Sequence, residues 1–309
     1  MDRGGGTQDL FRLDGRVALV TGAGKGIGAA IARAFADAGA DVALVARTRR
    51  DLEAVARDVQ SRGRRALVLP ADVNEVGGLA ALVSDAVGAL GGLDIVVNNA
   101  GGSQSRPFLD TRVEELEAAF HFNISVPFEL SRLAVPRLLE RPGSSIVNIS
   151  SMAGNNAPRG QLTHGTTKGA MCYLTRLMAA ELAPRIRVNA VLPGAVETEA
   201  LAGWLATMDP DIRRTMIERT AMRRNGVPDD IATAVVFLSS PAASWITGKL
   251  LEVDGSANPD LVPKFIPDLL VPGSRPRARP VRLDPPDPEP GEGVVCRVRW
   301  RIEISARTW

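Results

Sequence analysis

Seven short runs rich in valine, leucine and isoleucine recur between residues 16 and 255, and the segments between them are long enough to form helices. The first runs read RVALVT and DVALVA, and the helical segments that follow them begin near Gly28 and Arg49. The later runs read RALVLP, LDIVVN, SSIVNIS, RIRVNAVLP and KLLEVDG. Continuous apolar strands joined by helical crossovers are typical of a parallel sheet covered on both faces. The sequence therefore predicts an α/β fold with a doubly wound, Rossmann-type parallel sheet of seven buried strands and helices on both faces.

The composition changes after Ala257. About half of the chain's 21 prolines fall in residues 258–309, which include SRPRARPVRLDPPDPEPGEG. Proline disfavours helices and interior strands, so we expect a poorly ordered Pro/Arg-rich tail, with an edge strand in the final run VVCRVRWRIEIS as the alternative. The predicted organisation is an N-terminal extension over residues 1–12, a single α/β domain over residues 13–257, and this tail.

Charge and cysteine content argue against several classes of protein. The formal net charge of +2 comes from 37 basic and 35 acidic residues spread along the chain, so we expect no nucleic-acid or membrane partner. The two cysteines, Cys172 and Cys296, lie far apart without a Cys/His cluster nearby, which predicts neither a disulfide framework nor a metal site. The first residues lack the apolar run of a signal peptide, and we expect a soluble, cytoplasmic protein.

The segment TGAGKGIG, from Thr21 to Gly28, lies between the first expected strand and the first expected helix. Glycines at such a turn let backbone N–H groups and the helix N-terminus approach a pyrophosphate, whose negative charge the helix dipole favours. The position predicts a dinucleotide site, although glycine-rich turns also occur in many other loops. The residues expected to contact the cofactor here are Gly22, Gly24, Lys25, Gly26, Ile27 and Gly28.

The end of the second strand is expected to distinguish NADP from NAD. An acidic residue there would accept hydrogen bonds from the ribose 2′-OH, but this chain has Ala46 and Arg47. Arg47 and Lys25 would pair with a 2′-phosphate, so we predict NADP(H); the alternative is that both are ordinary solvated side chains. Asp72 and Val73, after the third strand, are expected to contact the adenine ring, unless they form only a strand-end cap.

Further motifs follow the glycine-rich loop in a fixed order. They are NNAG at 98–101, Asn123 in HFNISVPF, NISS at 148–151, Lys168, and PG at 193–194. With TGAGKGIG, this order and spacing resemble the short-chain dehydrogenase/reductase family over residues 13–257. The resemblance implies an oxidoreductase that uses a nicotinamide cofactor. It also implies a homo-oligomer, a tetramer or dimer, in which the helices around Asn123 and His164 pack on their copies.

The resemblance also implies roles for individual residues. Ser151 would hydrogen-bond the substrate oxygen, Lys168 would hold the nicotinamide ribose, and Asn123 would support a water linked to that lysine. Cofactor contacts are further implied for Asn99, Ala100, Gly101, Pro193, Gly194, Val196 and Thr198. The chain departs from the family near its end, because the second glycine usual after Asp254-Gly255 is Ser256.

One catalytic position also departs from the family pattern, which has a tyrosine four residues before the lysine; this chain has His164. An imidazole pKa of about 6.5 suits acid/base chemistry. The terminal nitrogen of a histidine side chain, however, lies roughly 2 Å nearer the main chain than the hydroxyl oxygen of a tyrosine. Lys168, one helical turn away, would lower the pKa of His164 and favour a base. The only tyrosine, Tyr173, is expected on the opposite helix face, in the core or an interface.

Three functions stay open. The first is an NADP(H)-dependent oxidoreductase that interconverts a secondary alcohol and a ketone, with His164 as the acid/base group. Its substrate would be a medium-sized apolar molecule of alicyclic, steroid-like or polyketide-like character. The second is a non-redox enzyme of the same fold, such as an isomerase or dehydratase, and the third is a cofactor-binding relative without turnover.

The substrate pocket is expected between residues 102–106, residues 152–161, and a helical lid over about residues 195–222 that includes Trp204 and Met208. Apolar side chains in these segments favour an apolar substrate. Three polar residues there would orient substrate oxygens or simply contact solvent: Asn155, Asn156 and Arg159.

Two reactive side chains outside these motifs are expected to have structural roles. His121, two residues before Asn123, is expected on a helix surface or in packing, and Cys172 is expected in the core.

Overall fold

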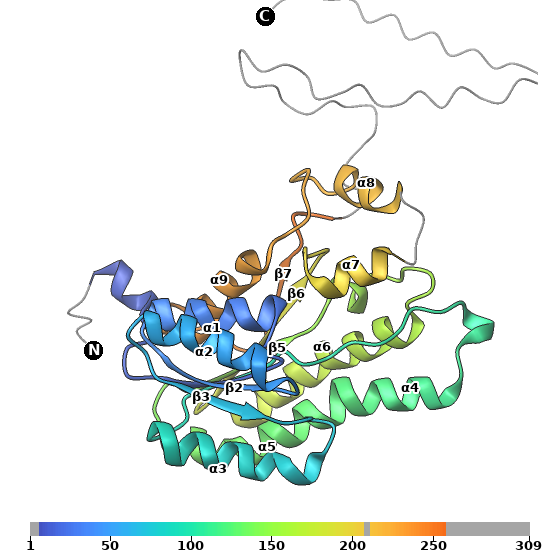
Figure 1. Cartoon of the computed structure of the whole chain (residues 1–309). Helices are drawn as coiled ribbons and strands as arrows, with labels where there is room; N and C mark the ends of the chain where they lie inside the picture. Colours follow the sequence, from blue (N-terminus) through green and yellow to red (C-terminus); the bar gives the residue numbers. More distant parts are fainter. Residues whose placement is uncertain (1–5, 207–210, 258–309) are drawn as a thin grey trace, which may run out of the picture. The chain divides into compact units, whose positions relative to one another are not determined.

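The computed structural model describes residues 6–206 and 211–257, which form one α/β unit (Figure 1). Its strands are β1 (Val17–Thr21), β2 (Asp41–Ala46), β3 (Ala66–Pro70), β4 (Ile95–Asn98), β5 (Ser145–Ile149), β6 (Arg187–Pro193) and β7 (Leu250–Val253). All pair in parallel in one sheet of order β3-β2-β1-β4-β5-β6-β7. The predicted doubly wound sheet of seven strands is confirmed. The predicted tail and Met208 lie outside the described residues.

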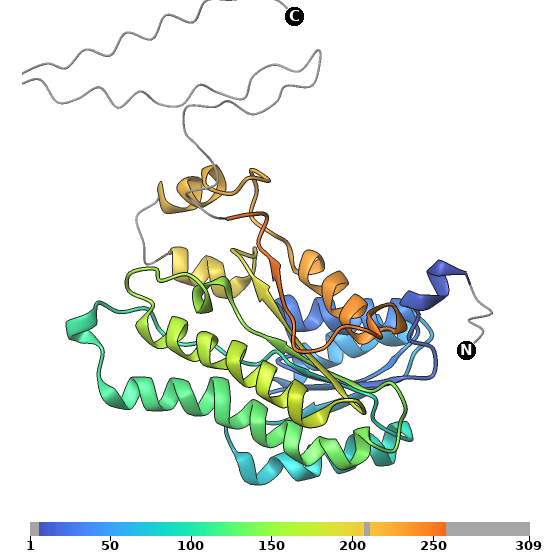
Figure 2. The same cartoon turned by 180° about the vertical axis from the view of Figure 1, so that it is seen from behind.

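The helices pack in two layers, one on each face of the sheet. Helices α1 (Gly26–Ala38), α2 (Arg49–Ser61) and α9 (Pro228–Ser239) share one hydrophobic cluster with the strands. Helices α3 (Leu79–Leu90), α5 (Val126–Leu138) and α6 (Leu162–Leu182) share the other cluster. Figure 2 shows these three helices together on one face of the sheet. The remaining helices are α4 (Val113–Phe120), α7 (Glu199–Leu205) and α8 (Asp211–Glu218), with a π-helical turn η4 (His121–Ser125) between α4 and α5.

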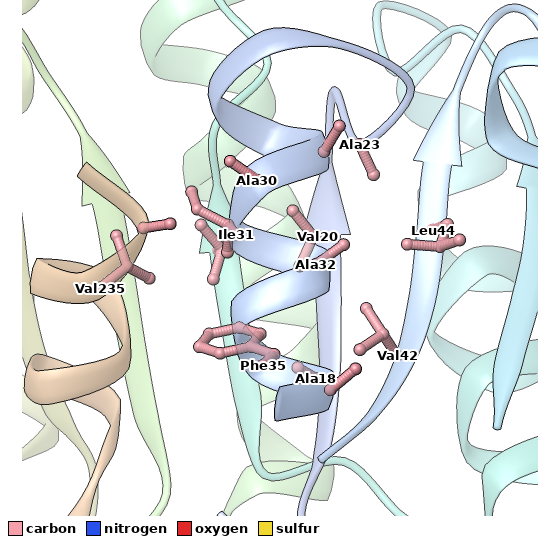
Figure 3. Close-up of a cluster of buried hydrophobic side chains, with 14 of the residues drawn as sticks. Ala18, Val20, Ala23, Ala30, Ile31, Ala32, Phe35, Val42, Leu44 and Val235 are labelled. Carbon is pink, nitrogen blue, oxygen red and sulfur yellow. The ribbon is translucent and has the colours of Figure 1, made fainter. Parts of the chain in front are cut away.

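Side chains of each inner strand point alternately into the two clusters. In β1, Ala18 and Val20 face the α1 side, whereas Val17 and Leu19 face the α3 side, and all four are buried. Figure 3 shows Phe35 of α1 among the side chains of the first cluster, where it is completely buried. Burying one such side chain stabilises the fold by about 1.5–3 kcal/mol. A strand covered on both faces is apolar at most positions, which explains the near-continuous apolar runs in the sequence.

The expectation of seven buried strands holds for the inner five and is wrong for the two outermost. Strands β3 and β7 are only partly buried, and Pro70 at the end of β3 is exposed. Among residues 6–206 and 211–257, each has a neighbouring strand on one side only, so each is an edge strand of the described sheet. An apolar run of five residues therefore does not by itself distinguish an edge strand from an inner one.

The two ends of the described unit are held by backbone hydrogen bonds. The expected N-terminal extension contains a 3₁₀ turn, η1 (Thr7–Phe11), and Leu13 directly after it is buried and donates its N–H to the carbonyl of Ala38 at 2.7 Å. At the other end Ser256 adopts a left-handed φ of 57°. The backbone thus keeps at Ser256 the conformation that favours glycine.

No helix among the described residues is both long and apolar enough to cross a membrane.

Candidate functional site

The loop between β1 and α1 is shaped by close approach of its own backbone. Gly22 has a φ of 65°, and a Cβ atom at Gly28 would lie 2.2 Å from the carbonyl oxygen of Gly22. No side chain fits at that point, so the first turn of α1 stays open to the groove at the carboxyl end of the sheet. Backbone N–H groups at a helix N-terminus, presented without side chains, are the cradle that a pyrophosphate requires. The loop therefore fits the dinucleotide that the sequence predicts.

The end of β4 is bound to the same loop. Asn99 donates its side-chain amide to the carbonyl of Thr21 at 2.9 Å, and the backbone N–H groups of Asn99 and Ala100 both donate to the Thr21 hydroxyl at 3.0 Å. Strand order reverses between β1 and β4, and ligands of open α/β sheets bind at such a switch point. The structure thus brings the predicted cofactor contacts of the glycine-rich loop and of residues 99–101 together.

The two basic residues expected to select NADP differ in their surroundings: Arg47 directly follows β2, and Lys25 lies in the glycine-rich loop. A Cβ atom at Gly24 would lie 3.5 Å from Cβ of Ala46, so the glycine-rich loop lies against the end of β2. Arg47 is exposed, and within the described part of the chain it has no hydrogen-bond or ion-pair partner. Lys25 instead lies 3.0 Å from Oε2 of Glu199 and 3.7 Å from Oδ2 of Asp51. The neighbouring carboxylates hold the pKa of Lys25 above its usual range.

The expected adenine contacts follow β3. Asp72 is exposed and accepts a hydrogen bond from the backbone N–H of Asn74 at 3.0 Å, whereas Val73 is buried. Asp72 therefore caps the end of the strand, as the simpler interpretation of the sequence expects, and a contact of either residue with adenine stays a prediction.

Asn123 lies in the π-helical turn η4 and is buried. Its side-chain amide donates to the carbonyls of Ala119 and Gly102 at 2.8 and 3.0 Å, and its Oδ1 accepts from the N–H of Gly102 at 2.9 Å. The bond to Ala119 replaces the backbone bond that a regular helix would make at this position. A Cβ atom at Gly101 would lie 2.8 Å from Asn123 Oδ1 and 3.1 Å from Lys168 Nζ. The side-chain amide of Asn123 and the ammonium of Lys168 therefore both lie next to Gly101.

Ser151 follows β5 and caps the 3₁₀ turn η5 (Met152–Gly154). Its hydroxyl oxygen accepts from the backbone N–H of Ala153 at 3.1 Å, and no described residue accepts its proton. The hydroxyl can therefore donate to a ligand. Ser150 faces the opposite way, and its hydroxyl donates to the carbonyl of Lys168 at 2.8 Å.

Helix α6 carries His164 and Lys168 one turn apart, and their environments move both pKa values. Burial and the charge of Lys168 lower the pKa of His164 to about 4, and burial lowers the pKa of Lys168 to about 8. The Lys168 ammonium donates to the carbonyl of Ile149 at 2.8 Å, whereas no described residue hydrogen-bonds the imidazole. At neutral pH the pair therefore consists of a neutral imidazole beside an ammonium.

Close packing fixes α6 against η5. A Cβ atom at Gly154 would lie 2.7 Å from the carbonyl carbon of Lys168, and one at Gly165 would lie 2.9 Å from the carbonyl oxygen of Ala153. Glycines on both sides let the two backbones touch, which sets the distance between Ser151 on one and His164 on the other. The structure thus brings together Ser151, His164, Lys168 and Asn123, the four positions that the resemblance implies.

The remaining predicted cofactor contacts lie after β6, across from the glycine-rich loop. Gly194 donates its backbone N–H to the carbonyl oxygen of Val253 at 3.1 Å. The side chain of Val196 is buried. Thr198 caps α7 by accepting from the N–H of Leu201 at 3.1 Å. A Cβ atom at Gly26 would lie 3.3 Å from Thr198 Cγ2, so Thr198 lies directly against the glycine-rich loop. Pro193 is buried at the end of β6.

A cavity of about 1170 Å³ opens beside this site. The three segments expected around the substrate all contribute to its wall, through Ser105 and Arg106, through residues 153–161, and through Trp204 with Ile212 of α8. Gly165 lines the cavity, whereas His164 and Ser151 do not. Asn155, Asn156 and Arg159 line it too, but the amide of Asn155 donates to Glu252 at 2.8 Å and is thus held by β7.

Other residues have the roles that the sequence predicts, with one exception. Cys172 is buried, and its Sγ lies 3.3 Å from the Ser150 hydroxyl. His121 is exposed, and its Nε2 lies 3.2 Å from the carbonyl of Asn74. Tyr173 is 61% exposed, so its expected place in the core is wrong, and its alternative place in an interface stays a prediction. No group of three or more His, Cys, Asp or Glu side chains in the described ranges could hold a metal ion.

A buried hydrogen-bond network that supports the site was missed at the sequence level. Asn98 of β4 donates to Ser131 of α5 at 3.0 Å and to Asn148 of β5 at 2.8 Å, and Asn148 donates to Thr175 of α6 at 2.9 Å. The network joins the two central strands to α6, which carries Lys168, and to α5, which directly follows the turn that carries Asn123. Asn98 and Asn148 belong to recognisable motifs, but single hydroxyl residues within helices, such as Ser131 and Thr175, carry no local signal.

Comparisons with known proteins agree with this geometry. A family model described as Enoyl-(Acyl carrier protein) reductase matches residues 22–258. An uncharacterized oxidoreductase of Mycobacterium tuberculosis (strain CDC 1551 / Oshkosh) is 47% identical over 262 residues, which are 84% of this chain and 99% of the relative. The 7alpha-hydroxysteroid dehydrogenase of Escherichia coli (strain K12) is 39% identical over 254 residues, which are 82% of this chain and 98% of that protein.

A solved structure is similar over the same region. It is a 7alpha-hydroxysteroid dehydrogenase complexed with NADH and 7-oxo glycochenodeoxycholic acid, with a TM-score of 0.77 and 39% identity. The similarity covers 81% of this chain and 97% of that one.

Proposed function

Because the chain belongs to the short-chain dehydrogenase/reductase family, we propose that it is an NADP(H)-dependent oxidoreductase that interconverts a secondary alcohol and a ketone, with His164 as the acid/base group. The 7alpha-hydroxysteroid dehydrogenases that match it support an oxidoreductase that acts on hydroxyl or keto groups with a nicotinamide cofactor. The observation that carries the proposal is the grouping of Ser151, His164, Lys168 and Asn123 at the carboxyl end of the sheet, next to a glycine-rich loop that fits a dinucleotide.

The proposed chemistry follows from the protonation states of these groups. A bound nicotinamide supplies the hydride acceptor or donor. Ser151 donates its free proton to the substrate oxygen, and the neutral imidazole of His164 takes the hydroxyl proton as the alcohol is oxidised. Burial and the charge of Lys168 lower the pKa of His164 to about 4, so at pH 7 the imidazole is present in its proton-accepting form and lacks the proton that reduction of a ketone would require. The proposed working direction is therefore alcohol oxidation.

The pH dependence of oxidation tests these two pKa values. We expect kcat/KM to be constant between about pH 5 and pH 7 because His164 is neutral there, and to fall below pH 5 as the imidazole takes a proton. It should also fall above pH 8, as Lys168 loses the charge with which it would hold the nicotinamide ribose. A pH–rate profile at constant ionic strength measures both limbs. An acidic limb near pH 6.5, where an exposed imidazole titrates, would contradict the proposed buried base.

The preference for NADP(H) is argued from this chain's own residues, because the solved relative described above holds NADH. We expect Arg47→Asp to weaken NADPH binding about 10- to 100-fold, since an acid at this position repels a 2′-phosphate, and to strengthen NADH binding. Fluorescence titration with both cofactors measures the change. Arg50→Asp is the matched control, because Arg50 is exposed three residues further on in α2. An unchanged ratio of the two dissociation constants in Arg47→Asp would overturn the assignment.

The proposed substrate is a medium-sized apolar molecule. Most side chains that line the cavity beside the site are uncharged, including Phe108, Leu162, Trp204 and Ile212, and its volume suits a molecule of several fused rings. Relatives that act on hydroxysteroids support this class. The segment over about residues 195–222 is proposed to act as the lid, since Trp204 and Ile212 belong to it.

Exposed apolar side chains on the helices near the site support the proposal of a homo-oligomer, a tetramer or dimer. Those on α4, α5 and α6 are Phe120, Phe128, Tyr173 and Leu177. Large apolar side chains that gather on neighbouring helices favour association with a second copy.

The low pKa of His164 also favours a second candidate, a non-redox enzyme that abstracts a proton from its substrate. A neutral imidazole with no protein hydrogen-bond partner is free to act as a base whether or not hydride moves. Product formation at constant absorbance at 340 nm would support this candidate.

The experiment that tests the proposed function assays the purified full chain with NADP(H) and NAD(H) against a panel of cyclic ketones and secondary alcohols. Cofactor-coupled turnover of an apolar cyclic substrate supports the proposal. If the protein binds NADPH but forms no product from any substrate, the proposed enzymatic function is contradicted. The chain would then be a cofactor-binding protein without turnover.

A further inference from the structure

Helix α7 is held at both ends by side chains from opposite walls of the groove. At its start, Glu199 Oε2 accepts from Lys25 Nζ of the glycine-rich loop at 3.0 Å. Near its end, Trp204 Nε1 donates to the hydroxyl of Ser105 at 3.2 Å. The first of these contacts spans the groove beside the point where Thr198 already touches Gly26. Glu199 is therefore the charged side chain that joins the proposed lid to the loop that would hold the cofactor.

Lys25 has two carboxylate neighbours, and this sets it apart from Arg47. Besides Glu199, Oδ2 of Asp51 lies 3.7 Å from the ammonium, so two negative charges offset one positive charge. Arg47, which directly follows β2, has no hydrogen-bond or ion-pair partner among the described residues. A 2′-phosphate that approached the loop would find Arg47 available and Lys25 already engaged.

We propose that Glu199 determines cofactor selectivity by competing with the 2′-phosphate of NADP(H) for the ammonium of Lys25. The inference rests on the proposed function, because it takes NADP(H) to bind in the glycine-rich loop. A phosphate group draws Lys25 away from Glu199, and the lost ion pair lowers the net affinity for NADPH. NADH has a hydroxyl group at that position and leaves the ion pair intact. Glu199 thus lowers the ratio of NADPH affinity to NADH affinity, and it does so without contacting the atoms that react.

The first test removes the competing charge with Glu199→Gln, which keeps the shape of the side chain. The pair is largely exposed, and exposed pairs are weak, so we expect NADPH to bind about threefold to fivefold more tightly while NADH binding is unchanged. Titration of the full chain with each cofactor, followed by quenching of protein fluorescence, measures both constants. The gain for NADPH should shrink in 0.5 M salt, since screening weakens exposed charge pairs. Glu114→Gln, at an exposed position in the first turn of α4, is the matched control.

A double-mutant cycle separates competition for Lys25 from any general effect on the lid. Lys25→Gln should weaken NADPH binding, and Glu199→Gln should then add nothing, because the shared ammonium is gone. A gain that persists in the Lys25→Gln background, or one that is equal for NADH and NADPH, would overturn the inference. The proposed cofactor preference is judged separately, by whether the natural protein binds NADPH more tightly than NADH. An unchanged NADPH constant in Glu199→Gln, with that preference present, refutes the competition alone.

Discussion

His164→Ala is expected to lower kcat for alcohol oxidation by about 10²–10⁴-fold, the range that a positioned acid/base group contributes. The imidazole is neutral at pH 7 because its pKa is lowered to about 4, and it has no hydrogen-bond partner in the described protein, so its removal deletes the base and breaks no hydrogen bond. The dissociation constant for NADPH should stay within about twofold, since the glycine-rich loop that binds the phosphates is untouched.

The matched control is His121→Ala, because His121 is the only other histidine in the chain and is exposed. Steady-state rates and cofactor titrations on the natural protein and both variants measure the effect. His164→Ala with full activity would remove the imidazole from the mechanism. A silent natural protein whose reductase activity appears in His164→Tyr would show that the histidine marks a chain without redox turnover, and would favour the non-redox and cofactor-binding alternatives.

Gly28→Ala is expected to weaken binding of both cofactors by about 100-fold and to destabilise the fold by about 2 kcal/mol, because the added methyl group has no space. Its Cβ atom would lie 2.2 Å from the carbonyl oxygen of Gly22 and 2.6 Å from the amide nitrogen of Asn99, so the loop must move away from the helix N-terminus. The same movement separates the loop from the end of β4, which Asn99 holds. Thermal unfolding should show a melting temperature lower by about 4–8 °C.

Gly88→Ala is the matched control, since a Cβ atom at Gly88 in the last turn of α3 would meet nothing within 4 Å. There the exchange should leave cofactor binding unchanged and stabilise the helix slightly, because alanine loses less conformational entropy than glycine. Cofactor affinity in Gly28→Ala that matches the natural protein would mean that the loop tolerates a side chain, and the fit to a pyrophosphate would be lost.

Much of this arrangement is encoded locally in the chain and could be predicted. A strand covered by helices on both faces is apolar at most positions, so the Val-rich runs located all seven strands, and the lengths between them indicated the crossover helices. The glycine-rich loop was predictable because Gly28 has no room for a side chain, and such a constraint leaves a visible residue pattern. The spacing of His164 and Lys168 placed both on one face of α6, and the direction of the shift in the imidazole pKa followed from that spacing.

Tertiary structure decided what depends on residues far apart in the chain. Lys25 and Glu199 are separated by 174 positions, and Ser105 and Trp204 by 99, yet each pair meets across the groove. The network from Asn98 to Thr175 and the partial exposure of β3 and β7 likewise depend on which elements become neighbours. Periodicity reports only whether a residue faces the core of its own helix or strand. Which charge or hydroxyl group stands opposite is fixed by packing between elements, and for that reason the lowered pKa of Lys168 and the engagement of Lys25 became apparent only in the folded chain.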